Sequence, residues 1–167
     1  MRDDGTMAGT LLLVMRHGPA EAAGPMGDAA RRLSPEGRAH TERAAAALAR
    51  LVPRPQGIWS SPLTRARETA ELLASALGAE APLVTRLLAP GFDCFRLAAE
   101  LGKAGPGPFA LVAHAPDVAG FTEWLIGAGG AGGIKFGSGT AALVTLAPPG
   151  AGVLHALYPL DTFAPLA

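Results

Sequence analysis

The chain has 167 residues, of which 49% are hydrophobic, so it is long enough and apolar enough for a globular domain with a sizeable core. Its 14 basic residues balance its 14 acidic residues, so it lacks the basic excess that is typical of nucleic-acid binding. Cys94 is the single cysteine, which excludes an intramolecular disulfide and a cysteine-rich metal site.

The N-terminus shows no signal peptide, and no apolar run approaches the length of a membrane span, so we expect a cytoplasmic protein that does not associate with membranes. Residues 1–9 are polar and contain glycine, which predicts a loose tail. The rest of the sequence has no internal repeat and no break in composition. We therefore expect residues 10–167 to form one domain.

Short apolar runs alternate along the chain with amphipathic segments that start at Ser or Pro and end at Gly or Pro. In chain order the predicted elements are a strand over 10–15, a loop over 19–33, a helix over 34–52, a strand over 57–60, a helix over 61–77, a short strand over 82–85, a helix over 93–103, a strand over 109–113, a helix over 116–126, a glycine-rich loop over 127–133 and two closing strands over 140–146 and 153–158. This alternation predicts a layered α/β fold with a mostly parallel sheet.

Polar side chains follow three of the predicted strands. Arg16 and His17 follow the first strand, Ser61 and Arg65 follow the second, and His114 follows the strand over 109–113. The carboxyl ends of parallel strands lie at one edge of a sheet, where ligands of α/β folds bind. Arginine offers a planar set of donors that matches phosphate oxygens, and the helix starts predicted after Ser61 and His114 favour anions. The pattern therefore predicts a pocket for a phosphoryl group.

A histidine in such a pocket is a plausible nucleophile. Neutral imidazole attacks phosphorus through one nitrogen while a backbone carbonyl or a carboxylate holds the other. The nearby arginines disfavour the protonated form of His17, and His114 and the arginines neutralise charge in the transition state. These cationic side chains take the place of a metal, so we expect neither a metal nor another cofactor.

Three motifs, in this order and spread over most of the chain, resemble those of the histidine phosphatase superfamily, also called phosphoglycerate mutase-like. They are Arg16-His17-Gly18, the segment Ser61-Pro62-Leu63-Thr64-Arg65-Ala66-Arg67-Glu68-Thr69-Ala70, and His114-Ala115-Pro116. The resemblance implies a three-layer α/β/α sandwich with a mostly parallel central sheet. It also implies that His17 is the phosphorylated nucleophile and that Arg16, Arg65 and His114 complete the phosphate pocket. Ser61 is a further candidate for substrate binding, although helix capping explains it equally well.

Further segments are similar to those of SixA-type phosphohistidine phosphatases within this superfamily. They are Asp28, Arg31, Leu33-Ser34, Gly37, Leu88-Ala89-Pro90-Gly91 and Lys135-Phe136-Gly137-Ser138-Gly139. Mutases and many phosphomonoesterases of the superfamily carry an acid near the third strand, which protonates an alkoxide leaving group. Residues 85–90 contain no acid, and the nearest downstream candidate is Asp93. Imidazole leaves more easily than an alkoxide, and little chain is available for a large lid, so both features favour a phosphohistidine substrate.

Three hypotheses follow for the function. The first is a metal-independent phosphatase that dephosphorylates phosphohistidine on a protein, such as a histidine phosphotransfer domain. The second is a phosphomonoesterase that acts on a small metabolite through the same pocket. The third is a non-catalytic module that binds phosphate, against which the intact nucleophile His17 argues. Mutase activity is the least supported, because the acid and the lid are both missing.

Overall fold

The computed structural model describes residues 9–129 and 132–163, so nearly all of the predicted tail over 1–9 and part of the glycine-rich loop lie outside the described residues. Within these residues the chain forms a six-stranded sheet with the order β3-β2-β4-β1-β5-β6. The strands are β1 (Thr10–Arg16), β2 (Gly57–Ser60), β3 (Leu83–Val84), β4 (Phe109–Ala113), β5 (Ala141–Leu146) and β6 (Leu154–Tyr158).

Four of these strands run parallel and two close the sheet in antiparallel pairing. β1 and β2 both pair parallel with β4, and β3 pairs parallel with β2. β5 is antiparallel to β1, and β6 is antiparallel to β5. Since Ala141 pairs with both Met15 and Tyr158, the start of β5 and the end of β6 lie at the same edge as the carboxyl end of β1.

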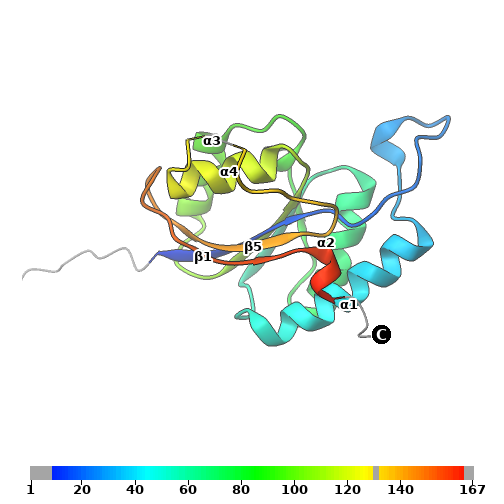
Figure 1. The fold of residues 1–167 in the computed structure, drawn as a ribbon, viewed down its shortest axis with the longest axis horizontal. Helices are drawn as coiled ribbons and strands as arrows, with labels where there is room; N and C mark the ends of the chain where they lie inside the picture. The colour runs from blue at the N-terminus through cyan, green and yellow to red at the C-terminus, as the bar shows by residue number, and fades with distance from the viewer. Residues whose placement is uncertain (1–8, 130–131, 164–167) are drawn as a thin grey trace, which may run out of the picture.

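Helices cover both faces of the sheet, as Figure 1 shows for α3 and α4 on one side and α1 and α2 on the other. They are α1 (Pro35–Leu51), α2 (Thr64–Leu77), α3 (Cys94–Lys103) and α4 (Asp117–Ile126), with short 3-10 turns η1 (Asp28–Ala30), η2 (Arg86–Leu88) and η3 (Leu160–Phe163). The prediction of a three-layer α/β/α fold with a mostly parallel sheet is therefore confirmed. No helix in the described ranges is long and apolar enough to cross a membrane.

The alternation of side chains along β1 builds two cores. Leu12 and Val14 belong to the cluster that packs under α3 and α4, whereas Leu13 and Met15 belong to the cluster under α1 and α2. A strand that is buried on both faces reads as a continuous apolar run, which is why residues 10–15 could be recognised as a central strand. This strand delivers Arg16 and His17 to the edge of the sheet.

Most helix boundaries agree with the predicted ones to within one or two residues. Ser34 caps α1 through a hydrogen bond from the Gly37 N–H to its hydroxyl, with Pro35 in the first position, as predicted.

The start of α2 was predicted wrongly, because the helix begins at Thr64 and not at Ser61. The backbone N–H of Ser61 still donates to the carbonyl of Val112 on β4, 2.9 Å away, and Leu63 is extended. Ser61 therefore extends the pairing of β2 with β4 by one bond, and the chain bends at 62 and 63 before the helix starts.

Candidate active site

The carboxyl ends of β1, β2 and β4 bring together the histidines and one arginine that the sequence pattern singles out. His17 follows β1, His114 follows β4, and Arg65 lies in the first turn of α2. All three are buried, with exposed fractions of 7% for His17, 4% for His114 and 6% for Arg65. The two imidazole rings lie 5.1 Å apart between centroids, at 57° to each other.

The hydrogen bonds of His17 define its tautomer. Its Nδ1 lies 2.7 Å from the carbonyl oxygen of Gly18, which can only accept, so Nδ1 carries the proton. Arg65 donates its Nε–H to Nε2 of His17 at 3.1 Å, and a guanidinium can only donate, so Nε2 is unprotonated. The ring is thus neutral, with its free electron pair at Nε2 directed toward Arg65.

The surroundings of His17 hold it in this neutral form. Burial, and to a lesser extent the charges of Arg65, Arg16 and Arg31, lower the pKa of His17 to about 4 against the opposing effect of the bond to Gly18. A neutral imidazole at physiological pH keeps the electron pair that a nucleophile needs.

Gly18 fixes the backbone next to His17. Its N–H donates to the hydroxyl of Thr69 at 3.0 Å, and a Cβ at this position would overlap the hydroxyl of Thr41 on α1. The glycine of the Arg-His-Gly motif is therefore required by the close approach of α1.

Arg65 is held in place by a residue from the loop between β1 and α1. Its NH1 donates to the backbone carbonyl of Asp28 at 2.7 Å, and its NH2 donates to the carboxylate of Asp28 at 2.9 Å. Arg31 donates to the other oxygen of the same carboxylate at 2.9 Å. With the bond to His17, three of the five N–H groups of Arg65 are engaged, which leaves two for a ligand.

His114 is paired with Ser61 across the edge of the sheet. The Nε2 of His114 lies 2.7 Å from the hydroxyl oxygen of Ser61, and the exposed fraction of Ser61 is 0%. The Nδ1 of His114 is buried and has no hydrogen-bond partner among the described residues. Burial, His17 and Arg65 lower the pKa of His114 to about 4. Ser61 thus contacts His114 in this structure, and its direct contact with phosphate stays a prediction.

Arg16 is tied to the segment that precedes β5. Its NH1 donates to the carbonyl of Phe136 at 2.8 Å, and its backbone N–H donates to the carbonyl of Thr140 at 2.9 Å. Its Nε is buried without a partner within the described part of the chain. Burial and the nearby Arg65 lower the pKa of Arg16. Two adjacent guanidinium groups that repel each other in this way are a favourable setting for an anion.

Sequence reasoning assigned no role to Asp28 or Arg31, although both were part of the resemblance to SixA-type proteins. The structure brings them to the site because the loop from 19 to 33 folds back over Arg65. Glu68 of α2 anchors the end of this loop, since its carboxylate accepts the backbone N–H of Leu33 at 2.8 Å and the Nε–H of Arg32 at 2.7 Å. The spacing of Asp28 and Arg31 on a loop contains no periodic signal that predicts this contact.

Asp93, the candidate acid nearest to the third strand, has a structural role as the cap of α3. Its carboxylate accepts the N–H of Arg96 at 2.9 Å and caps α3. Within the described ranges, no group of three or more His, Cys, Asp or Glu side chains is arranged to hold a metal ion.

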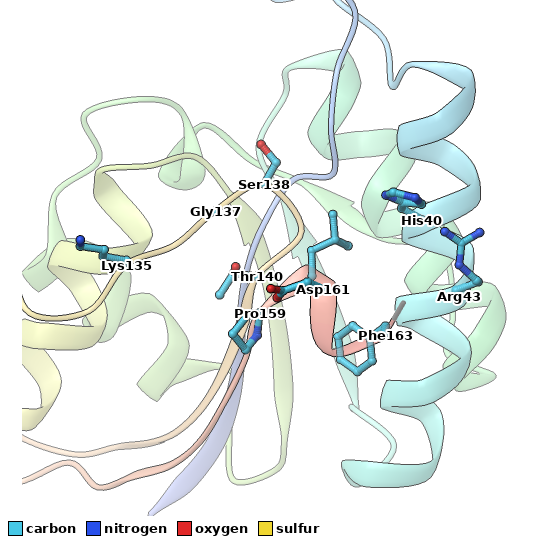
Figure 2. Close-up of a pocket in the computed structure, with 10 residues that line it drawn as sticks. His40, Arg43, Lys135, Gly137, Ser138, Thr140, Pro159, Asp161 and Phe163 are labelled. Carbon is cyan, nitrogen blue, oxygen red and sulfur yellow. The ribbon is translucent and has the colours of Figure 1, made fainter. Parts of the chain in front are cut away.

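A separate cavity of about 510 Å³ lies at the same end of the sheet, and Figure 2 shows the side chains that line it. His40 and Arg43 reach it from α1, and Lys135 and Asp161 reach it from the segments beside β5 and β6. Gly137, Ser138 and Thr140 also line it, and the backbone of this segment bonds to the site, because the N–H of Gly139 donates to the carbonyl of His17 at 2.9 Å. None of the predicted catalytic residues lines this cavity.

Comparison with known proteins agrees with this geometry. A family model described as histidine phosphatase superfamily (branch 1) matches residues 12–88. An uncharacterised protein from Picosynechococcus sp. (strain PCC 7002) is 38% identical over 117 residues, which cover 68% of this chain and 69% of the relative.

Solved structures match the fold over most of the chain. The protein histidine phosphatase SixA in complex with tungstate superposes with a TM-score of 0.82 at 23% identity, covering 93% of this chain and 100% of SixA. A protein described as a phosphohistidine phosphatase SixA from Agrobacterium tumefaciens gives a TM-score of 0.74 at 23% identity, with coverages of 89% and 97%. A mycobacterial glucosyl-3-phosphoglycerate phosphatase gives 0.70 at 20% identity, with coverages of 90% and 99%. At these identities the similarity establishes the fold.

The motif order, the matching family model and the shared fold lead to one conclusion. The chain belongs to the histidine phosphatase superfamily.

Proposed function

We propose that this protein is a metal-independent phosphatase that forms a phosphohistidine on His17 and acts on phosphohistidine carried by another protein, in the cytoplasm. The observation that carries the proposal is the state of His17, whose Nδ1–H is held by the Gly18 carbonyl while its Nε2 electron pair lies beside the Nε–H of Arg65. A neutral imidazole oriented in this way is an activated nucleophile.

The reaction proceeds in two transfers of the phosphoryl group. In the first, Nε2 of His17 forms a bond to phosphorus while the bond from phosphorus to the substrate breaks and its electron pair leaves with the substrate. The phosphorylated ring keeps its Nδ1 proton, which the Gly18 carbonyl stabilises. In the second, water attacks phosphorus, the electron pair of the P–N bond returns to Nε2, and the water proton goes to the departing phosphate.

The two arginines supply the positive charge in this mechanism, and His114, whose low pKa keeps it neutral, can contribute a hydrogen bond. Arg65 lies within hydrogen-bond distance of Nε2, where the phosphorus arrives, and Arg16 lies near enough to lower the pKa of His17 by its charge. In both transfers the three equatorial oxygens carry the charge, and fixed donors in a buried site stabilise it without rearrangement.

The carboxylates near the site favour phosphohistidine over an alkyl ester as the substrate. Two arginines hydrogen-bond Asp28 and lower its pKa, so it stays ionised and cannot protonate an alkoxide. Asp93 is engaged in capping α3. An imidazole leaving group does not need such an acid, because its second nitrogen can already carry a proton. The similarity in fold to SixA supports the same choice of substrate.

The test compares the wild-type protein with His17→Ala on a phosphohistidine-bearing phosphotransfer domain and on p-nitrophenyl phosphate. We expect rapid loss of phosphohistidine with the wild type and none with His17→Ala. His155→Ala is the matched control, since His155 is exposed on β6 and its imidazole is hydrogen-bonded to the Thr145 hydroxyl, away from His17 and His114. Loss of phosphohistidine that persists in His17→Ala would remove this histidine from the mechanism, and turnover confined to phosphate esters would instead favour a metabolite phosphatase.

A further inference from the structure

Asp28 lies on the solvent side of Arg65. The exposed fraction of its side chain is 59%, whereas that of the Arg65 side chain to which it bonds is 7%. Arg65 therefore bridges His17 on the buried side and Asp28 on the open side. The carboxylate therefore lies next to a guanidinium that also contacts Nε2 of His17.

The carboxylate of Asp28 keeps the capacity to accept further hydrogen bonds. One oxygen accepts from Arg31 and the other from Arg65, and each carboxylate oxygen offers two acceptor positions. Its charge also reaches the second histidine, because it acts to raise the pKa of His114 against the stronger lowering effects of burial and of His17. The carboxylate is thus exposed to solvent, bonded to the arginine beside His17, and able to accept further hydrogen bonds.

The chemistry of transfer between two imidazoles makes a specific demand on the entering ring. On the enzyme side, His17 reacts through Nε2 while a carbonyl oxygen accepts the hydrogen bond of Nδ1–H. On the substrate side, the ring must leave as neutral imidazole, so its nitrogen remote from phosphorus must carry a proton when the P–N bond breaks. An acceptor for that N–H stabilises the reactive protonated form of the substrate ring, as the Gly18 carbonyl does for phosphorylated His17.

We propose that Asp28 accepts the hydrogen bond of the remote N–H of the substrate imidazole and thereby selects phosphohistidine over phosphate esters. The inference rests on the proposed function. No atom is gained or lost by Asp28: the bond from phosphorus to the substrate nitrogen breaks, its electron pair stays on that nitrogen, and the proton on the remote nitrogen remains there while hydrogen-bonded to the carboxylate. An ester substrate has no such N–H and gains nothing from Asp28.

The experiment measures kcat/KM of the full chain on phosphoimidazole and on p-nitrophenyl phosphate for wild type, Asp28→Asn and Glu21→Gln. Asparagine keeps an oxygen for Arg65 but removes the charge and one acceptor. Glu21→Gln is the matched control, because it removes a charge from the same loop, and the loop contact of Glu21 to Arg31 is made by its backbone carbonyl. We expect Asp28→Asn to lower kcat/KM on phosphoimidazole by about tenfold or more relative to p-nitrophenyl phosphate, and Glu21→Gln to leave the ratio unchanged.

Two other outcomes overturn the inference. Equal losses on both substrates would show that Asp28 only positions Arg65, and equal gains would show that it only shields the pocket. The failure of the proposed function has a different result, because the wild-type protein would then hydrolyse p-nitrophenyl phosphate through His17 but leave phosphoimidazole intact.

Discussion

Arg65 donates its Nε–H to the Nε2 of His17 over 3.1 Å. The guanidinium that would bind the phosphoryl group is therefore hydrogen-bonded to the electron pair that would attack phosphorus. This single contact fixes the tautomer of the ring and the direction of attack. It also means that a ligand must share or replace this hydrogen bond when phosphorus approaches Nε2. Several measurable consequences depend on this pair and its neighbours.

Arg65→Ala should raise the pKa of His17 from about 4, because it removes a nearby positive charge and opens the pocket to water. NMR titration of the imidazole resonances measures this shift. The same variant should lose about a hundredfold or more in kcat through the loss of a preorganised donor. Arg67→Ala, an exposed arginine two residues along α2, is the control and should change neither quantity. An unchanged His17 pKa in Arg65→Ala would contradict the electrostatic account.

The two buried histidines should make stability depend on pH below neutrality. Their pKa values fall from 6.5 to about 4 on folding, so between these values the unfolded chain binds more protons than the folded protein. The free energy of unfolding is therefore not reduced by these histidines above about pH 6.5. It decreases as the pH falls toward 4, by up to a few kcal/mol for each histidine. Urea unfolding at a series of pH values measures this slope. It should become shallower in His17→Ala and shallower again when His114 is also replaced.

Ser61→Ala should lower activity through its effect on His114. This effect does not require Ser61 to contact the substrate. The Nε2 of His114 would lose its hydrogen-bond partner in a buried position, which costs about 1–3 kcal/mol. We expect a lower kcat and a broadened or shifted His114 imidazole signal in NMR spectra. Ser60→Ala is a close control, since this buried hydroxyl donates only to the carbonyl of Ser61. Equal effects of the two substitutions on kcat would argue against a special role for the Ser61–His114 pair.

Gly18→Ala should damage both stability and activity. The added methyl group would overlap the Thr41 hydroxyl, so α1 or the backbone beside His17 must shift, at a cost of about 2 kcal/mol. Thermal unfolding and kcat report the two effects. Gly120→Ala in α4 is the counterpart, because a Cβ there meets no atom within 4 Å and should stabilise the helix. The double variant Gly18→Ala and Thr41→Ala should recover part of the lost stability.

Tungstate, which is bound in the SixA structure with the same fold, should raise the melting temperature of this protein. Such an anion can bind the two N–H groups of Arg65 and the Nε–H of Arg16 that have no partner within the described residues. The stabilisation should disappear in Arg16→Ala and Arg65→Ala. It should persist in Arg43→Ala, because Arg43 lines the separate cavity beside η3. A shift that depends on Arg43 alone would place the anion in that cavity.

The central features of the fold follow from the sequence because they depend on local patterns. The continuous apolar run of β1, and the Ser-Pro start of α1, identify these elements without knowledge of their neighbours. The same logic brings His17 and His114 to one edge, since parallel strands end together. The start of α2 was misplaced because Ser61 and Pro62 are also typical of a helix start, whereas the backbone of Ser61 bonds to the neighbouring strand.

The part of the site that sequence reasoning could not place comes from the loop. Asp28 reaches Arg65 from a loop whose end is anchored by the carboxylate of Glu68 at Leu33, a contact between positions 35 residues apart. Loop conformations depend on such single long-range bonds and not on periodicity, so the motif residues were recognisable while the contact was not. The expectation that little chain is available for a lid also did not include this coverage of Arg65 by Asp28.

The loop over the site has a consequence for how this family could diversify. Its two ends are joined by a bridge between Ala20 and Leu33 and by Glu68, whereas Asp28 lies on the segment between them. Insertions or replacements between the two anchors would change the entrance without moving β1 or the nucleophile. Exchange of this one segment between relatives is therefore a direct route to redesigned substrate preference on an unchanged β1 and His17, provided that the new segment also holds Arg65.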